Sequence, residues 1–133
     1  MKNFVIHNAA GQILQTGSVI EAMLPLQADA GKGRFMLEGE GSLALDRVVD
    51  GKIVRRPKMP YTLSAVAVQA DGSTAVTLAG VPAGASVRIA GPTSVNGIAD
   101  GTTIALTFAL PGQYFVSVEL FPYIDVKEVI NAI

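Results

Sequence analysis

Cysteine and tryptophan are absent from this sequence, and histidine occurs once, as His7. Without cysteine the chain can form no disulfide bond, no thiolate zinc site and no cysteine nucleophile. A single histidine excludes a metal site built from several histidines. Because His7 ends an apolar run beside a turn, we predict that it has a structural role at the surface or at the end of a hairpin. These absences lead us to expect no enzyme and no cofactor.

Charged residues are scarce as well, at 16% of the 133 residues against about 25% in typical soluble proteins. They nearly balance, with 10 basic and 11 acidic side chains, so no general attraction to nucleic acid is expected. Half of the residues are hydrophobic, and the mean hydropathy is +0.43. A free monomer of this composition would expose a surface with few charges. The composition therefore favours a subunit of an assembly.

Long hydrophobic runs are missing too. The longest stretch of low polarity, residues 104–110, is seven residues long, whereas a membrane-spanning helix needs about 20. Residues 1–7 contain one lysine and three consecutive apolar residues, which is too few for the apolar core of a signal peptide. We therefore expect no membrane insertion, and synthesis in the cytoplasm without a signal peptide.

The charges divide the chain unevenly. Residues 1–60 carry eight basic and six acidic side chains, whereas residues 61–133 carry two and five. Between them, Pro57 and Pro60 favour extended, non-helical backbone. We predict an N-terminal β-rich lobe at 1–56, a linker at 57–62 and a C-terminal β-sandwich at 63–133.

The C-terminal lobe has the clearer strand pattern. In residues 104–110 and 114–120 apolar side chains alternate with small or polar ones, as in a strand with one buried face. Pro111-Gly112 separates the two stretches, and we predict that they pair as an antiparallel hairpin. Further short strands are expected at residues 65–69, 74–78 and 84–89. The lobe is therefore predicted to be a small β-sandwich, immunoglobulin-like or prealbumin-like.

In the N-terminal lobe, residues 4–6 and 12–15 predict a hairpin in which Gly11 takes a positive φ. Residues 19–24 predict a helical turn that Pro25 stops. A strand at 34–38 and a hairpin at 47–54, turning at Asp50-Gly51, complete a small β-meander. The whole chain is thus predicted to be all-β.

The acidic residues that could carry chemistry have structural explanations. Asp50, Asp71 and Asp100 each precede a glycine, which is typical of turns, and they lack the clustered spacing of a calcium loop. Glu38 and Glu40 could form a carboxylate pair of the glycosidase kind. They flank Gly39, however, and a solvated loop is the better interpretation.

The remaining candidate motifs are incomplete. Gly80–Ala85 has the glycines of a phosphate loop without its terminal Gly-Lys-Ser/Thr. No serine lies in a Gly-x-Ser-x-Gly motif. The basic cluster at residues 52–58 lacks the interleaved aromatic residues of a nucleic-acid site, so we interpret it as a solvated linker or a contact with an acidic partner surface.

Several segments, taken in order, resemble small proteins encoded in the tail gene modules of tailed bacteriophages and prophages. The segments are Gly11–Gly17, Leu26–Ala28, Val49–Pro60, Leu78–Val87, Asp100-Gly101, Pro111–Tyr114 and Phe121–Asp125. The resemblance covers most of the chain and rests on turn and strand signatures. It implies a virion structural protein associated with the tail fibre or baseplate, whose partners are other phage structural proteins and copies of itself.

Assembly is then the expected mechanism, and no small-molecule ligand is expected. The predicted partner-interface residues are Phe115, Phe121, Pro122, Tyr123, Val126, Val129, Ile130, Ile133, Arg55 and Arg56. Phe115 should face away from the row of Tyr114, and the apolar C-terminal residues should dock on a neighbour or add an edge strand. A capsid decoration protein and a receptor- or carbohydrate-binding module at a fibre tip remain alternatives, the latter weakened because tryptophan is absent and only three tyrosines occur.

Overall fold

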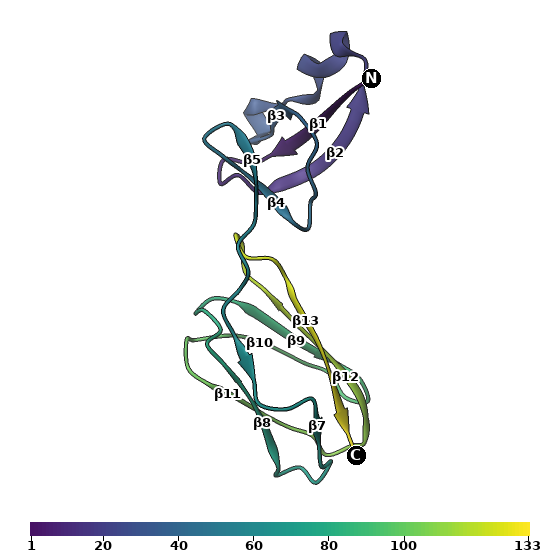
Figure 1. Ribbon diagram of the computed structural model, residues 1–133, viewed down its shortest axis with the longest axis vertical. Coiled ribbons are helices and arrows are strands. Elements are labelled where there is room, and N and C mark those ends of the chain that lie inside the picture. The colour runs from purple at the N-terminus through teal and green to yellow at the C-terminus, as the bar shows by residue number, and fades with distance from the viewer. The chain divides into compact units, whose positions relative to one another are not determined.

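The computed structural model describes all 133 residues, which form two compact units, Met1–Pro57 and Lys58–Ile133 (Figure 1). Strands dominate both units, and the all-β prediction is confirmed. The predicted linker at 57–62 is not a separate segment. Met59 is buried in the core of the second unit and Tyr61 packs against that core, so the packing of this unit begins before its first strand, which starts at Thr62.

The N-terminal unit is built around strand β1, which pairs antiparallel with two neighbours in the order β2-β1-β3. A two-stranded hairpin, β4-β5, and two 3₁₀ helices complete the unit. The elements are β1 (Lys2–His7), β2 (Ile13–Val19), η1 (Glu21–Gln27), η2 (Ala30–Lys32), β3 (Phe35–Glu38), β4 (Asp46–Val49) and β5 (Lys52–Arg55).

Strand β1 is buried on both faces. Phe4 and Ile6 form one small core with Leu24 of η1, whereas Val5 points to the other face and packs with Ile13 and Val48. Because successive side chains of a strand alternate between faces, three consecutive apolar residues fill two cores. This explains why the run Phe4–Ile6 has no polar residue.

Both hairpins form where their turns predict them. Gly11 has φ +86°, and a Cβ there would lie 2.1 Å from the carbonyl oxygen of Val48, so only glycine fits. Asp50 and Gly51 both have positive φ, as the two central residues of a type I′ turn require. The prediction that Pro25 stops the helical turn is wrong, since η1 continues through it to Gln27. The fixed φ of proline is compatible with a helical turn.

The C-terminal unit consists of a five-stranded sheet, β10-β9-β12-β13-β7, and a three-stranded sheet, β11-β8-β6. All strand pairs are antiparallel except β13 with β7, which is parallel. The strands are β6 (Thr62–Leu63), β7 (Ala67–Val68), β8 (Ala75–Ala79), β9 (Ser86–Ala90), β10 (Val95–Ile98), β11 (Ile104–Thr107), β12 (Gly112–Glu119) and β13 (Val126–Ala132).

One hydrophobic core lies between these two sheets. It joins Val76 and Leu78 of the three-stranded sheet to Ile89, Val116 and Ile130 of the five-stranded sheet. Each of these strands contributes every second residue to the core, so the alternating pattern gives each sheet one apolar face that packs against the other sheet. The unit therefore has the two-layer character that the sequence predicts for a β-sandwich.

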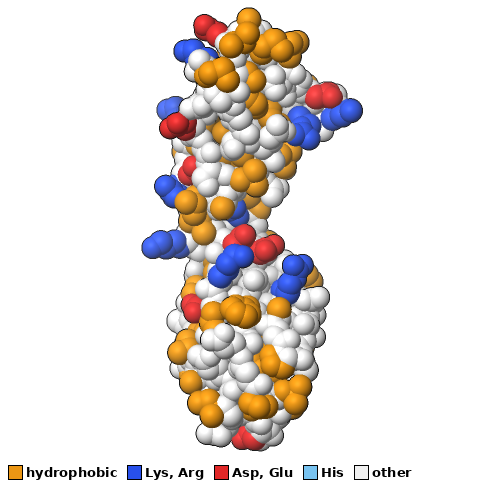
Figure 2. All heavy atoms as spheres, turned by 90° about the vertical axis from the view of Figure 1, so that its right-hand side faces the viewer, with side chains coloured by type: hydrophobic (Ala, Val, Ile, Leu, Met, Phe, Trp, Pro, Cys, Tyr) orange, Lys and Arg blue, Asp and Glu red, His pale blue; other side chains and the backbone are white.

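The predicted hairpin between residues 104–110 and 114–120 is wrong. Strand β11 pairs with β8, and β12 pairs with β9 and β13. The turn at Pro111-Gly112 carries the chain from one sheet to the other, so both strands keep an apolar face toward the common core without pairing. On the face of this unit seen in Figure 2, hydrophobic side chains are spread among uncharged ones and most charged side chains gather at one end.

Candidate functional site

The outward face of the five-stranded sheet carries an exposed aromatic residue at its centre. Phe115 of β12 lies directly opposite Val129 of β13 and Ala90 of β9. Its side chain is 54% exposed and that of Val129 is 38% exposed, whereas Tyr114 and Val116, its neighbours in the chain, are buried. The predicted outward direction of Phe115 is therefore confirmed.

Two cations lie in the adjacent row of the same face. Ser117 of β12 is opposite Arg88 of β9 on one side and Lys127 of β13 on the other. Both cations are exposed, and neither takes part in the ion pairs Lys2–Glu38, Lys32–Asp29 or Arg55–Asp46. We call Arg88, Ala90, Phe115, Ser117, Lys127 and Val129 the outer face. It combines an apolar centre with two cations that form none of these ion pairs, and the exposed Glu119 is the next outward residue of β12 after Ser117.

Sequence reasoning missed Arg88 and Lys127. Each is the direct chain neighbour of buried residues on its strand. Arg88 lies between Val87 and Ile89, and Lys127 follows Val126. This alternation indicates that both cations point outward. It does not show that they lie on either side of Ser117, because that depends on the order of the strands in the sheet.

The predicted apolar C-terminal docking segment is wrong for Val126 and Ile130. Both are buried, Ile130 completely at 0% exposure, because β13 is an inner strand that pairs with β12 and β7. The segment does not add to an edge of its own unit. Val129 and Ile133 remain exposed, and the backbone of Ile133 exchanges hydrogen bonds with Val68 and Ala70.

The prediction of partner contacts also includes the segment Phe121, Pro122 and Tyr123. They form the connection between β12 and β13, and each is half-buried. Tyr123 packs against the core, and its backbone N–H donates to the carbonyl of Leu120 at 2.8 Å. Tyr123 therefore belongs to the packing of its own unit, and contact of Phe121 and Pro122 with a partner stays a prediction.

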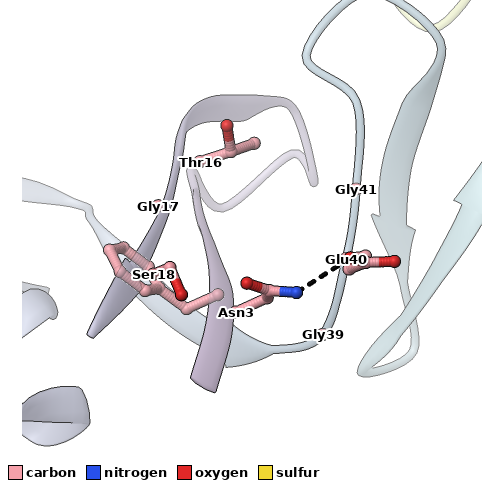
Figure 3. A pocket seen from close by; sticks show the side chains of 8 residues that line it. Asn3, Thr16, Gly17, Ser18, Gly39, Glu40 and Gly41 are labelled. Carbon is pink, nitrogen blue, oxygen red and sulfur yellow. Dashed lines mark hydrogen bonds between the residues drawn. The ribbon is translucent and has the colours of Figure 1, made fainter. Parts of the chain in front are cut away.

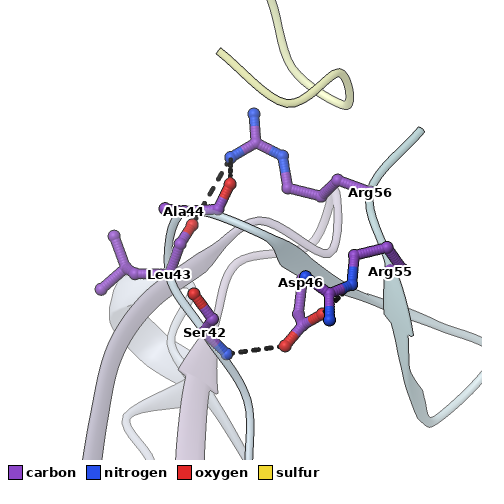
Figure 4. Close-up of polar contacts among 6 residues, drawn as sticks. All are labelled: Ser42, Leu43, Ala44, Asp46, Arg55 and Arg56. Carbon is purple, nitrogen blue, oxygen red and sulfur yellow. Dashed lines mark hydrogen bonds and ion pairs between the residues drawn. The ribbon is translucent and has the colours of Figure 1, made fainter. Parts of the chain in front are cut away.

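Arg55 and Arg56 have different surroundings in the N-terminal unit (Figure 4). Arg55 is exposed and its Nε lies 3.5 Å from the Asp46 carboxylate. Arg56 is 8% exposed, and its Nη1 donates to the carbonyl oxygens of Leu43 and Ala44 at 3.5 and 3.1 Å. The prediction that Arg56 faces a partner is therefore wrong, because its guanidinium binds the backbone of its own unit.

A shallow pocket of about 380 Å³ lies between β1, β2 and the segment after β3 (Figure 3). Its polar contact is the amide of Asn3, which donates to the Glu40 carboxylate at 2.9 Å. Phe4, Thr16, Ser18 and three glycines line the rest, and a Cβ on Gly17 would meet the Phe4 ring. Glu38 does not line this pocket, and its carboxylate lies 3.5 Å from Nζ of Lys2. The pocket therefore contains one carboxylate, that of the exposed Glu40.

His7 lies at the end of β1, where its ring stacks on Phe35 with centroids 5.7 Å apart. Its Nδ1 is 2.8 Å from the carbonyl oxygen of Asn8. Among all 133 residues, no three His, Asp or Glu side chains come together in a way that could hold a metal ion.

Two aspartates of the C-terminal unit cap turns. Asp71 accepts hydrogen bonds from the hydroxyl and backbone N–H of Thr74 and from the backbone of Ser73, and these bonds hold its pKa well below the usual range. Asp100 accepts from the hydroxyl and backbone of Thr102, which also lowers its pKa. Hydrogen bonds to a carboxylate favour its charged form. Both residues therefore act in turns, as the sequence predicts.

A further carboxylate, Glu128 of β13, accepts a 2.5 Å hydrogen bond from the hydroxyl of Tyr61. This bond raises the pKa of Tyr61. It fastens the beginning of the C-terminal unit to its last strand.

No protein-family model matches this chain, and comparisons with curated proteins and with solved structures also give no match. The structure contains no helix long and apolar enough to cross a lipid bilayer.

Proposed function

We propose that this chain is a non-enzymatic structural subunit of a bacteriophage tail, associated with the tail fibre or baseplate, and that its C-terminal unit is an immunoglobulin-like assembly module. The outer face carries this proposal, since it is an exposed surface with the composition of a contact site. Its role would be to hold neighbouring virion proteins together.

The strand order supports the immunoglobulin-like assignment. In that fold two sheets share one core, and consecutive strands change sheets repeatedly. Here β8, β11 and β6 make one sheet, while β9, β10, β12, β13 and β7 make the other. Strands β8 and β9 are consecutive but lie in different sheets, and so do β10 and β11, and β11 and β12.

A second support is the position of Tyr114 near the start of β12. Its hydroxyl donates to the carbonyl of Leu110, four residues earlier, at 2.7 Å, as does the tyrosine of the corner found in immunoglobulin-like sandwiches. Antibody domains place a disulfide cysteine two residues after that tyrosine. Here Val116 takes that place in the core, which fits a chain without cysteine.

The composition of the outer face supports a role in contacts between proteins. Aromatic residues and arginine are enriched at the centres of protein interfaces, where they become desolvated. Phe115 and Arg88 occupy neighbouring rows of one rigid sheet. The cations of the outer face fit a partner that presents carboxylates around an apolar patch, and the resemblance to tail-module proteins indicates where such a partner would occur.

The test is to locate the chain in purified phage particles. The gene is replaced by an epitope-tagged copy, and immunogold labelling identifies the labelled structure. We expect gold at the tail fibre or baseplate. Label on the capsid surface would favour a decoration protein instead, and absence of the chain from particles would refute a structural role.

A pair of substitutions then tests the outer face. Phe115→Ser should lower the amount of chain incorporated into particles, whereas Thr107→Ser, a change on the exposed side of the other sheet, should not. Both variants should unfold at about the wild-type temperature, because neither side chain is in the core. Normal incorporation of Phe115→Ser would remove the outer face from the assembly mechanism.

A further inference from the structure

Strand β10 is an edge strand whose four residues are all exposed. It pairs with β9 on one side only, so its other side presents unpaired backbone N–H and C=O groups. Val95 is 61% exposed and Ile98 is 71% exposed. Such an edge is a template for pairing with another strand.

This edge lacks the features by which proteins normally block such pairing. Exposed edges usually carry lysine or other charges, a proline within the strand, or a bulge. Strand β10 has the sequence Val-Asn-Gly-Ile and a regular register with β9. In the 21 residues Gly91–Pro111, which also contain the edge strand β11, Asp100 is the sole charged residue. Nothing in the strand opposes the approach of an uncharged strand.

An apolar groove of about 160 Å³ opens between β10 and β11. It is lined by the side chains of Val87, Ile89, Val95, Ile98, Ile104 and Leu106, together with Gly97 and Ala99. The groove is of a size suited to one aliphatic side chain rather than to a larger ligand.

Gly97 leaves this groove open, although the unit itself does not require a glycine there. Every other glycine in the chain either has a positive φ or has an atom within 4 Å of the position of a Cβ, whereas Gly97 has neither. Glycine inside a strand often marks the close approach of another chain. The open position beside β10 therefore points to an occupant from outside the unit.

We propose that β10 pairs antiparallel with β10 of a second copy of this chain, around a two-fold axis at Asn96. The inference deepens the assembly role proposed above, on which it rests for its place in the virion, by naming a second copy as one partner. Pairing would join two five-stranded sheets into one continuous sheet and satisfy the free backbone groups of both edges.

The register follows from the alternation of side chains. Residues opposite each other in an antiparallel pair lie on the same face. With the axis at Asn96, the two Asn96 side chains are opposite each other, and Val95 of each copy lies opposite Gly97 of the other. The Val95 side chain of one copy then lies beside Gly97 of the other copy, where the groove is open.

A second copy fits better than a charged partner. The edge and the groove offer no charge for recognition, whereas an identical strand is uncharged, equally short and free to pair. Because the contact is isologous, the same residues serve both copies and the pairing closes after two. Asp100 lies outside the strand, and Arg88, which is opposite Asn96, lies on the neighbouring strand β9, so neither of the two pairing strands carries a charge.

Cysteine cross-linking tests the register directly, because the natural chain has no cysteine. In the full-length chain, Asn96→Cys should form a covalent dimer under mild oxidation, since opposite residues of antiparallel strands have Cα atoms about 4.5–5.5 Å apart. Ser94→Cys is the matched control. Its two copies would be separated by roughly 14 Å at about 3.4 Å per residue, and it should stay monomeric on a denaturing gel. Equal cross-linking of both variants, or none at Asn96→Cys, would overturn the proposal.

Charge exchange at the axis provides the second test. Asn96→Lys and Asn96→Glu should each be monomeric in sedimentation equilibrium, because like charges directly opposite each other destabilise a strand pair. An equimolar mixture of the two should form a dimer. Asn96 is exposed, so both variants should retain the wild-type circular dichroism spectrum.

The outcomes separate this proposal from the proposed function. If either single variant dimerises as well as the wild type, or if the mixture stays monomeric, β10 does not pair with itself and the edge belongs to another partner. Neither result depends on particles, so immunogold label on the tail would still stand. Conversely, loss of the tail assignment would leave a measured β10 dimer intact.

Discussion

The hydroxyl of Tyr114 donates a 2.7 Å hydrogen bond to the carbonyl oxygen of Leu110, across the turn that carries the chain from one sheet of the C-terminal unit to the other. The ring itself is fully buried and lies 4.4 Å, centroid to centroid, from Phe108. The ring of Tyr114 thus packs in the core, while its hydroxyl stabilises the turn between the two sheets.

Tyr114→Phe should therefore destabilise the C-terminal unit while preserving its packing. Removing the hydroxyl deletes one partly buried hydrogen bond, and we expect the free energy of unfolding to fall by about 1 kcal/mol. Urea denaturation followed by circular dichroism measures this change. An unaltered midpoint would mean that solvent satisfies the Leu110 carbonyl.

Arg56 and Arg55 form a natural comparison in the N-terminal unit. Arg56→Met should lower the free energy of unfolding by roughly 1–3 kcal/mol, because the carbonyls of Leu43 and Ala44 lose their donor. Arg55→Met removes an exposed ion pair with Asp46 and should change it by no more than about 0.5 kcal/mol. Thermal unfolding of both variants provides the measurement, and equal effects would contradict the structural role of Arg56.

Gly17 and Gly97 make a second matched pair. A Cβ on Gly17 would lie 2.6 Å from Cζ of Phe4, whereas a Cβ on Gly97 would meet nothing within 4 Å. Gly17→Ala should thus cost roughly 1–3 kcal/mol through overpacking, and Gly97→Ala should stay within about 0.5 kcal/mol of the wild type. Chemical denaturation distinguishes them, and a neutral Gly17→Ala would show that Phe4 can move aside.

Asp71 predicts the direction of acid sensitivity. Its pKa in the folded unit is lowered, chiefly by the hydroxyl of Thr74 and then by backbone N–H groups. A lowered folded-state pKa gives stability that is present above the unfolded pKa of about 3.9 and is lost as pH falls through the folded value. The unfolding temperature should therefore drop as pH is lowered below about 4.

The matching variant is Asp71→Asn, which cannot titrate. Its unfolding temperature should fall less steeply over the same acidic range than that of the wild type, and Asp100 should account for part of the remaining slope, because its pKa is also lowered. Parallel curves for the wild type and Asp71→Asn would show that the Asp71 turn does not contribute to acid sensitivity.

Local signals in the sequence predict the hairpins well. Asp50-Gly51 can adopt the positive φ values of a tight turn, and the strands on either side pair in register around it. At Pro111-Gly112 the same kind of turn signal does not predict the pairing of the strands on either side. A turn signal marks a break between strands, but it does not tell whether the next strand pairs with the last one or crosses to another sheet.

The prediction of an exposed C-terminal segment is wrong for a different reason. Its inward row includes Glu128 between Val126 and Ile130, and a carboxylate at an inward position hides the alternation of a buried strand. The hydroxyl of Tyr61, 67 residues earlier, satisfies that carboxylate. The outer face could be predicted only through Phe115, because the cations beside it come from strands distant in sequence.

The parallel pairing of β13 with β7 sets the order in which this polypeptide can fold as it emerges from the ribosome. All strands of the N-terminal unit are present once Pro57 has been synthesised. The second core, by contrast, stays open until residues 126–132 arrive, because they insert between β12 and β7. Until then the facing edges of β12 and β7 both lack a strand partner, so a stalled or shortened chain would present unpaired backbone groups that favour aggregation.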